Sequence, residues 1–218
     1  MKRFYEIADY LQKKKLIHRI RANFFVSNTI TLSEDKDSLF ELKTGMRVKL
    51  GDISYKVERI VKQNNKRYRV FVDKDITVHS SAWMLDFDYL TGTRADILNT
   101  QKSAPLIWLL YPLQEDFTES ILYKTASPVF VFAATVDRNA GINEREQTVY
   151  DVLEPLKDLW LYTMQINRFN SFFEFNGKEQ LINHTATAYY LYGNDSKEVF
   201  EFTTAAIELI LNNLKLKI

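Results

Sequence analysis

The stretch SPVFVFAATVDRNAGINEREQTVYDVLEPLKDLW, residues 127–160, joins an apolar run to a charged helical pattern. Residues 129–136 are nearly all apolar and predict a strand in a sheet. The turn DRNAGIN follows, and Asn143 with Glu146 three positions later predicts a helix that begins with an Asn cap. These patterns predict a strand, a turn and a helix that packs on the sheet of that strand.

The helical part of this stretch carries one apolar stripe, with charged and Gln residues opposite it. The stripe consists of Val149, Val152, Leu153, Leu156, Leu159 and Trp160. Pro155 lies within the pattern, where it removes a backbone donor and clashes with the preceding turn. We therefore expect a kink or a local break near residues 151–154.

Two more apolar segments extend the predicted sheet. Residues 105–111, bounded by Pro105 and Pro112, are a continuous apolar run that predicts a strand buried on both faces, beside residues 129–136. In the ending IELILNNLKLKI, residues 207–218, the apolar side chains change from odd to even positions across Asn212-Asn213. A bulge or bend at that point would permit the change.

The first half of the chain has a different pattern. Residues 2–15 predict a short amphipathic helix, since Phe4, Ile7 and Leu11 recur at helical spacing. Apolar residues then alternate with polar ones between residues 40 and 75, and Gly51-Asp52 predicts a two-residue type II′ turn with Gly51 at positive φ. This alternation is typical of antiparallel strands.

The sequence therefore predicts an α+β fold. Residues 1–15 and 103–218 would form a core with a mixed or antiparallel sheet and packed helices. Residues 16–90 would be an inserted β-rich subdomain, either a small β-barrel or a β-meander, and residues 91–102 a connecting loop.

Composition excludes several classes of function. The 218 residues include 29 Lys and Arg against 28 Asp and Glu, for a net charge of +1, so no uniform field attracts nucleic acid or anionic membrane. The absence of Cys excludes disulfides, thiolate catalysis and Cys-based zinc sites. The longest apolar runs are half the roughly 20 residues that a membrane-spanning helix needs.

Catalytic patterns are missing from the sequence. There is no Gly-rich phosphate loop, no GxSxG elbow and no His-x-x-x-His pair. We expect no catalytic, metal-binding or cofactor-binding residue and no bound cofactor, and hence no enzyme. The alternative of an unrecognised catalytic site would require His18, His79 or His184 to meet carboxylates in a pocket.

A second alternative is an accessory protein that binds nucleic acid through the β-rich subdomain. The stretch KQNNKRYR, residues 62–69, offers Lys66, Arg67 and Arg69 to a phosphate backbone, with Tyr68 able to stack on a base. The same alternation also describes the outer face of a hairpin.

The order of elements in the second half resembles the tail-terminator and head-tail joining proteins of bacterial viruses. Those proteins share an N-terminal helix, a central sheet, a helix packed on it and a closing C-terminal strand. The residues that carry the resemblance are 105–108, 128–133, Arg145, 152–156 and the ending NNLKLKI. It covers residues 1–15 and 103–218, whereas the β-rich segment is much larger than the loop that such proteins usually carry.

The resemblance implies a structural subunit of a neck or tail ring in the virion, assembled in the host cytoplasm. It implies a ring of 6 or 12 copies between partners such as a portal-side connector and the tail tube, with DNA passing through unbound to any specific site and with no membrane. Such a ring needs two complementary patches on each subunit. Both signs of charge are available from Asp137, Arg138, Glu144, Arg145 and Asp151, which are the candidate interface residues.

Overall fold

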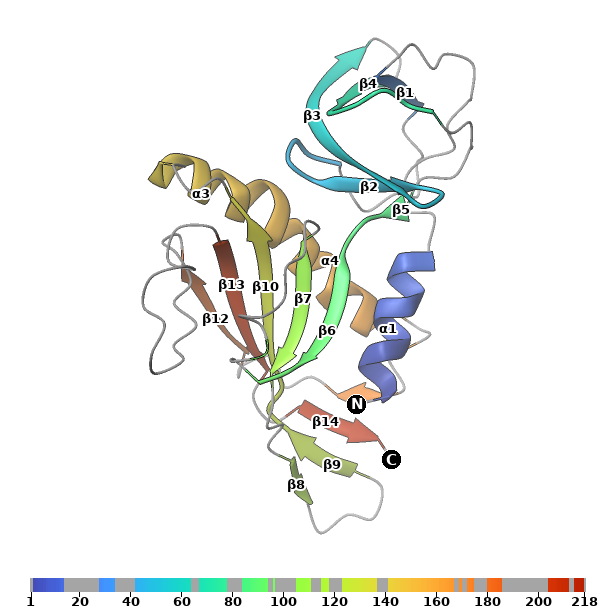
Figure 1. Ribbon diagram of the computed structural model, residues 1–218. Coiled ribbons are helices and arrows are strands. Elements are labelled where there is room, and N and C mark those ends of the chain that lie inside the picture. Colours follow the sequence, from blue (N-terminus) through green and yellow to red (C-terminus); the bar gives the residue numbers. More distant parts are fainter. Residues whose placement is uncertain are drawn as a thin grey trace. The chain divides into compact units, whose positions relative to one another are not determined.

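The computed structural model divides the chain into two compact units (Figure 1). The structure describes residues 2–13, 28–33, 42–63, 67–77, 84–93, 96, 105–110, 115–117, 123–136, 141–166, 169, 172–174, 180–185, 204–211 and 214–217. The core unit comprises residues 1–7 and 88–218, and the β-rich unit comprises residues 8–87. The β-rich unit is thus inserted into the chain of the core unit.

The core unit contains a five-stranded mixed sheet. Its strands, in spatial order, are β12 (Gln180–Thr185), β13 (Thr204–Leu211), β10 (Val129–Thr135), β7 (Leu106–Leu110) and β6 (Asp88–Gly92). β6 runs parallel to β7, and the other neighbours are antiparallel. With the helices, this sheet confirms the predicted α+β class.

The two central strands are buried on both faces, as their apolar runs predict. All five residues of β7 are buried. Opposite pairs in an antiparallel sheet share a face, so Phe132 and Ile107 lie on one side. Val131 and Trp108 lie on the other side, in a second apolar cluster that also contains Ala206.

One helical segment packs on the first of these faces. It consists of α3 (Ile142–Thr148), a π-helical turn η1 (Val149–Leu153) and α4 (Glu154–Gln165). Every residue of the predicted apolar stripe is buried. The N–H of Glu154 donates to the carbonyl of Val149, five residues back. This widened turn lies immediately before Pro155 and confirms the expected local break.

The predicted helix start at Asn143 is wrong. The helix begins two residues earlier than an Asn143 cap implies, at Ile142, and Gly141 is the extended N-cap residue with φ −67° and ψ 168°. No side chain caps this end. Glycine is a favourable N-cap residue although it has no side-chain acceptor, so the helix can begin after Gly141 rather than after Asn143.

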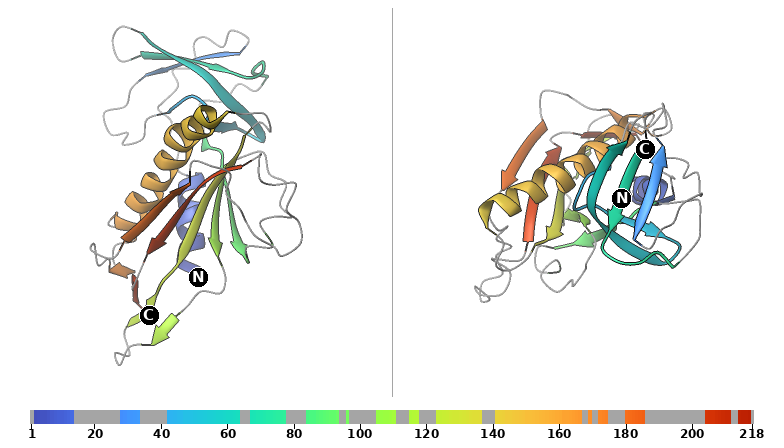
Figure 2. Two further views of the ribbon diagram at one scale, coloured as in Figure 1. Left: turned by 90° about the vertical axis from the view of Figure 1, so that its left-hand side faces the viewer. Right: turned by 90° about the horizontal axis from the view of Figure 1, so that it is seen from above.

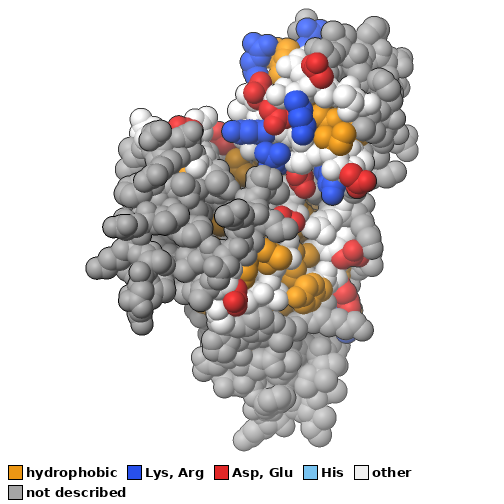
Figure 3. Space-filling model, in the orientation of Figure 1, with side chains coloured by type: hydrophobic (Ala, Val, Ile, Leu, Met, Phe, Trp, Pro, Cys, Tyr) orange, Lys and Arg blue, Asp and Glu red, His pale blue; other side chains and the backbone are white. Residues whose placement is uncertain are grey.

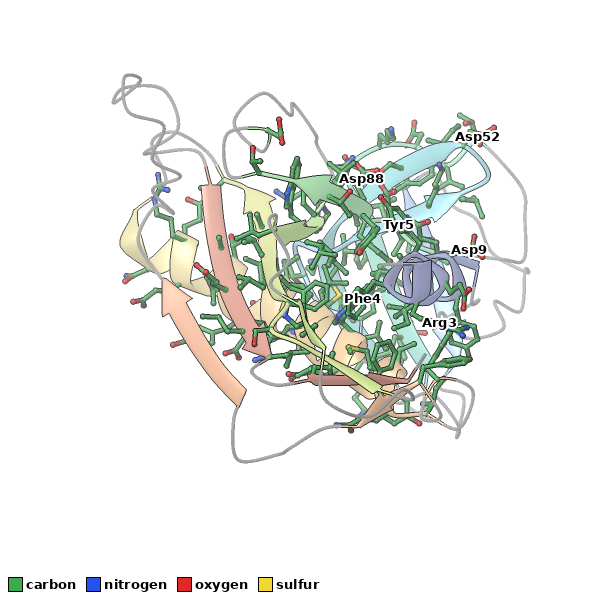
Figure 4. All side chains as sticks on the ribbon, turned by 90° about the horizontal axis from the view of Figure 1, so that it is seen from below. Arg3, Phe4, Tyr5, Asp9, Asp52 and Asp88 are labelled. Atoms are coloured by element: carbon green, nitrogen blue, oxygen red, sulfur yellow. The ribbon has the colours of Figure 1, made fainter. Side chains whose placement is uncertain are left out.

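The N-terminal helix α1 (Lys2–Lys13) supplies a second contact to the same sheet face, through the part that belongs to the core unit. Phe4 points from α1 into the core (Figure 4), where its ring lies 5.1 Å from that of Phe130. Phe130 in turn lies 5.3 Å from Trp160 of α4. The N-terminal helix and α4 therefore both contact Phe130 of β10.

The described part of the core unit also contains a second, antiparallel sheet. Its order is β11 (Phe173–Glu174), β14 (Leu214–Lys217), β9 (Tyr123–Ala126) and β8 (Glu115–Phe117). The C-terminal segment thus passes from one sheet to another between Leu211 and Leu214, both of which are buried. Leu211 before Asn212-Asn213 and Leu214 after it are the buried residues, so the change of parity coincides here with a change of sheet. The side chains of Leu216 and Ile218 lie outside the described part.

The β-rich unit contains one five-stranded antiparallel sheet. Its order is β1 (Thr29–Ser33), β4 (Arg67–Val72), β3 (Ile53–Gln63), β2 (Arg47–Leu50) and β5 (Met84–Leu85). The β2–β3–β4 part is a meander in which the long strand β3 curves (Figure 2). Gly51 in the β2–β3 turn has φ 60°, as predicted, and the register shifts between Val57 and Arg59.

Among the described helices, none is long and apolar enough to cross a bilayer.

Candidate functional site

The outer side of the helical segment carries exposed tyrosines among carboxylates. Tyr150 is 57% exposed and Tyr162 is 42% exposed. The five carboxylates of residues 141–166 are half-buried or exposed, namely Glu144, Glu146, Asp151, Glu154 and Asp158. Tyrosine is enriched at protein–protein interfaces because it combines a large apolar ring with a polar tip.

The π-helical turn aligns these side chains. Tyr150 and Tyr162 are twelve positions apart, which in a regular α-helix is a rotation of about 120° from alignment. The π turn absorbs one extra residue, so the offset falls to about 20°. We call the resulting line of Glu146, Tyr150, Glu154, Asp158 and Tyr162 the acidic stripe.

Neither cation of the helical segment is exposed. Residues 141–166 contain only two, Arg145 at 7% exposure and Lys157 at 6%. The ammonium of Lys157 lies 3.4 Å from a carboxylate oxygen of Asp158. The surface that this segment presents is therefore acidic and aromatic, without a positive side chain.

The candidate interface residues consequently lie in different environments. Glu144 is exposed and Asp151 is half-buried on the helical segment. Arg145 is buried within the chain, where it offers little surface to a neighbouring subunit. The sequence contains a signal for this burial: Arg145 lies four residues before Val149, which places both side chains on the same face of the helix. Asp137 and Arg138 lie outside the described residues.

A contrasting surface lies on the outer face of the sheet in the β-rich unit. Arg59 pairs with Phe71 across β3 and β4, and Val61 pairs with Arg69, so all four share one face. Their neighbours in sequence, Val70 and Val72, are buried on the opposite face. The guanidinium carbon of Arg59 lies 4.0 Å from the centre of the Phe71 ring, a cation–π contact.

The positive character of this face continues on β2 and the start of β3. Arg47 pairs with Lys56, and Lys49 pairs with Ser54. Because Val48 and Leu50 point inward, Arg47 and Lys49, which alternate with them, point outward, and so does Lys56 opposite Arg47. We call the set Arg47, Lys49, Lys56, Arg59, Val61, Arg69 and Phe71 the basic sheet face. Figure 3 shows Lys and Arg side chains over the β-rich unit, with some acidic ones among them.

One cation of the basic sheet face is held by a local network. The Nε of Arg47 donates to the hydroxyl of Ser54 at 2.9 Å, and this hydroxyl donates to Asp86. Arg47 also lies 3.9 Å from the Asp86 carboxylate. Arg47 is thus largely neutralised, which leaves Lys49, Lys56, Arg59 and Arg69 to define the charge of the face.

The predicted nucleic-acid residues are only partly within the described structure. Arg69 is exposed on the basic sheet face. Arg67 lies in β4 opposite Gln63, but its side chain is outside the described part, as is all of Lys66. Sequence reasoning missed Arg59, although the alternation along β3 places it opposite Phe71 once the bulge is known.

A third polar feature follows β6. The N–H and the hydroxyl of Thr93 both donate to one carboxylate oxygen of Asp96, at 2.7 and 2.8 Å. The Asp96 N–H donates back to the Thr93 carbonyl at 3.1 Å and to the Thr93 hydroxyl at 3.4 Å. These bonds, from the backbone first and the hydroxyl second, lower the pKa of Asp96. The arrangement is that of a reciprocal capping motif, which is structural.

The described residues contain no group of three or more His, Asp or Glu side chains that could hold a metal ion. His18 and His79 lie outside the described residues, and His184 belongs to β12, where its side chain is not among those described.

No protein-family model, no curated protein and no solved structure matches this chain.

Proposed function

We propose that this chain is a structural subunit of a multimeric ring in the neck or tail of a bacterial virus, where it joins the head or portal side to the tail around a DNA channel. The observation that carries the proposal is the acidic stripe. It presents two exposed tyrosines, Tyr150 and Tyr162, in line on a helix whose opposite side is fully buried. Exposed aromatic side chains aligned on a rigid element favour a protein partner.

The organisation of the core unit supports the same proposal. Its order is α1, the strands of the mixed sheet, the helical segment on that sheet and the closing strand β14. This is the order of elements in the tail-terminator and head-tail joining proteins that the sequence resembles. The inserted β-rich unit would then contact an adjacent subunit or an adjacent ring.

The partners follow from the role. The chain would bind itself in a ring of 6 or 12 copies, and the ring would bind neck or tail neighbours such as a portal-side connector or the tail tube. DNA would pass through the ring rather than bind specifically, which suits a net charge of +1. The protein would act in the virion without catalysis, without a cofactor and without a membrane.

The native mass of the full chain tests this proposal. Native mass spectrometry is applied to the purified protein alone and after mixing with a particle fraction from its source. The expected result is a closed multimer of 6 or 12 copies, formed alone or only on the particle. A chain that stays monomeric in both conditions and never co-migrates with particles would overturn the proposal.

A further inference from the structure

We infer that the acidic stripe of one copy of this chain binds the basic sheet face of the next copy, so that the subunits associate head to tail. This inference rests on the proposed ring and identifies the two surfaces that would close it. A ring with rotational symmetry requires two different patches on each subunit. The stripe and the sheet face belong to different units of the chain and carry opposite charge.

The helical segment that carries the acidic stripe offers no exposed cation of its own. Five carboxylates lie on a helical segment whose two cations, Arg145 and Lys157, are both buried. A second copy of the same stripe would bring carboxylates together, which is unfavourable. Charge repulsion therefore disfavours a two-fold contact between identical stripes and favours a basic partner surface.

The basic sheet face has the required chemistry. Stacking on Phe71 orients the Arg59 guanidinium, whose planar donors suit carboxylates in bidentate pairs. Val61 is 41% exposed between Arg59 and Arg69, so an apolar contact for a tyrosine ring lies among the cations. Charged pairs around an aromatic centre are the composition of a specific protein interface.

Two carboxylates favour a protein rather than a nucleic acid on this face. Glu58 is the extra residue at the β3 bulge and is exposed next to Arg59. Asp73 is exposed at the end of β4, where its carboxylate accepts the N–H of Lys56 at 2.9 Å. Carboxylates beside the cations repel a phosphate backbone, whereas a protein partner can pair with both signs of charge.

Charge reversal in the two surfaces tests the inference with the full chain. The first variant is Arg59→Glu with Arg69→Glu, and the second is Glu146→Lys with Glu154→Lys. Asp158 is left in place because it pairs with buried Lys157. The wild type should assemble. For each variant alone, the association constant between subunits should fall by about 100-fold or more, because like charges then face each other.

An equimolar mixture of the two variants should recover assembly. In the mixture, the unchanged stripe of the first variant meets the unchanged sheet face of the second, and the two reversed surfaces also meet. Native mass spectrometry should then detect complexes in which the two variants alternate in equal numbers. Two control variants carry the same changes of charge at exposed residues of the β-rich unit that lie outside the basic sheet face. Lys62→Glu with Lys74→Glu is the control for the first variant, and Asp52→Lys with Asp75→Lys is the control for the second. Both controls should assemble as the wild type does. Thermal unfolding of every variant checks that each is folded.

The outcomes separate this inference from the proposed function. If the wild type never assembles, the proposed ring fails. If the wild type assembles and each reversed variant still assembles alone, the ring stands and the inferred surfaces are wrong. If both variants are monomers and their mixture also stays monomeric, the inferred contact between copies is overturned. Loss of binding to a single-stranded or duplex DNA probe in the first variant, with assembly intact, would overturn it in favour of nucleic acid.

Discussion

The ring of Phe4 meets the ring of Phe130 edge to face, with the centroids 5.1 Å apart and the ring planes at 83°. Phe130 also contacts Trp160, and Trp160 stacks on Tyr89 with the centroids 5.5 Å apart. Tyr5 closes the group by an edge contact to Tyr89 at 5.1 Å. This aromatic cluster joins α1, β6, β10 and α4, so the helical segment that carries the acidic stripe is held by contacts that begin at the N-terminus.

Phe4→Ala should strongly destabilise the core unit. The side chain is fully buried and its loss leaves a cavity between α1 and β10, at a cost of about 3–5 kcal/mol in the free energy of unfolding. Urea unfolding followed by fluorescence of the cluster measures this loss. Tyr162→Ala, on the exposed outer side of α4, should change the free energy of unfolding by less than about 0.5 kcal/mol. Equal losses in the two variants would show that α1 is not anchored in this way.

Gly92→Ala should destabilise the protein more than Gly141→Ala does, although Ala is a poorer N-cap residue than Gly. A Cβ at position 92 would lie 2.9 Å from the buried ring of Trp108 and 2.8 Å from the Asp96 carboxylate. Trp108 also donates from Nε1 to the Gly92 carbonyl at 3.1 Å, so a shift of the ring strains a hydrogen bond. The expected cost is about 1–3 kcal/mol. A Cβ at position 141 meets nothing within 4 Å. Thermal unfolding that lowers both melting temperatures alike would contradict this prediction.

The sequence predicted the elements whose signal is local. The strands around Val131 and Trp108 are continuous apolar runs. Pro155 predicts the irregular turn because proline has no backbone N–H and clashes with the preceding helical turn. The strand β6, Asp88–Gly92, was assigned partly to the insertion and partly to the loop. Its five residues lack an apolar run, and what defines it is parallel pairing with β7, a contact distant in sequence.

The surfaces were harder to predict than the strands. Charge on the helical segment was visible in the sequence, but the burial of Arg145 and Lys157 depends on how the segment packs on the sheet. The place of Arg59 on the same face as Arg69 depends on the bulge after Val57, which changes the alternation of inner and outer residues along β3. Both features follow from tertiary contacts rather than from local pattern.

The carboxyl of Asp96 should titrate below its usual pKa of 3.8. The Thr93 N–H and hydroxyl stabilise its charged form, so its contribution to stability is present above the unfolded pKa and is lost as the pH falls through the lowered folded value. NMR titration measures the pKa directly. Thr93→Val keeps the N–H and removes the hydroxyl, and should move the pKa part of the way back. An unchanged pKa in that variant would mean that the hydroxyl bond contributes nothing.

Tyr150→Ala should weaken assembly without affecting folding. The side chain is 57% exposed in the chain by itself, so its truncation should change the free energy of unfolding by less than about 0.5 kcal/mol. As an interface residue it should cost about 2 kcal/mol or more in each subunit contact. Sedimentation of the multimer over a dilution series measures the difference. Gln147→Ala, an exposed substitution outside the acidic stripe, is the matched control, and equal behaviour of the two variants would argue against a role for Tyr150.

Deleting Asp151 together with Pro155→Ala should leave both the fold and the assembly intact. The Glu154 N–H reaches back five residues to Val149, so η1 contains one residue more than a regular α-helical turn needs. Removing that residue, and the proline that cannot donate in a regular helix, should produce a continuous α-helix with the buried side and the acidic stripe still in phase.

Deleting Asp158 instead should rotate the following residues by about 100°, which takes Trp160 and Met164 out of the core and abolishes cooperative unfolding. Circular dichroism during thermal unfolding, followed by native mass spectrometry, distinguishes the two deletions. If the Asp151 deletion unfolds like the Asp158 deletion, the π turn is itself required by the packing on the sheet.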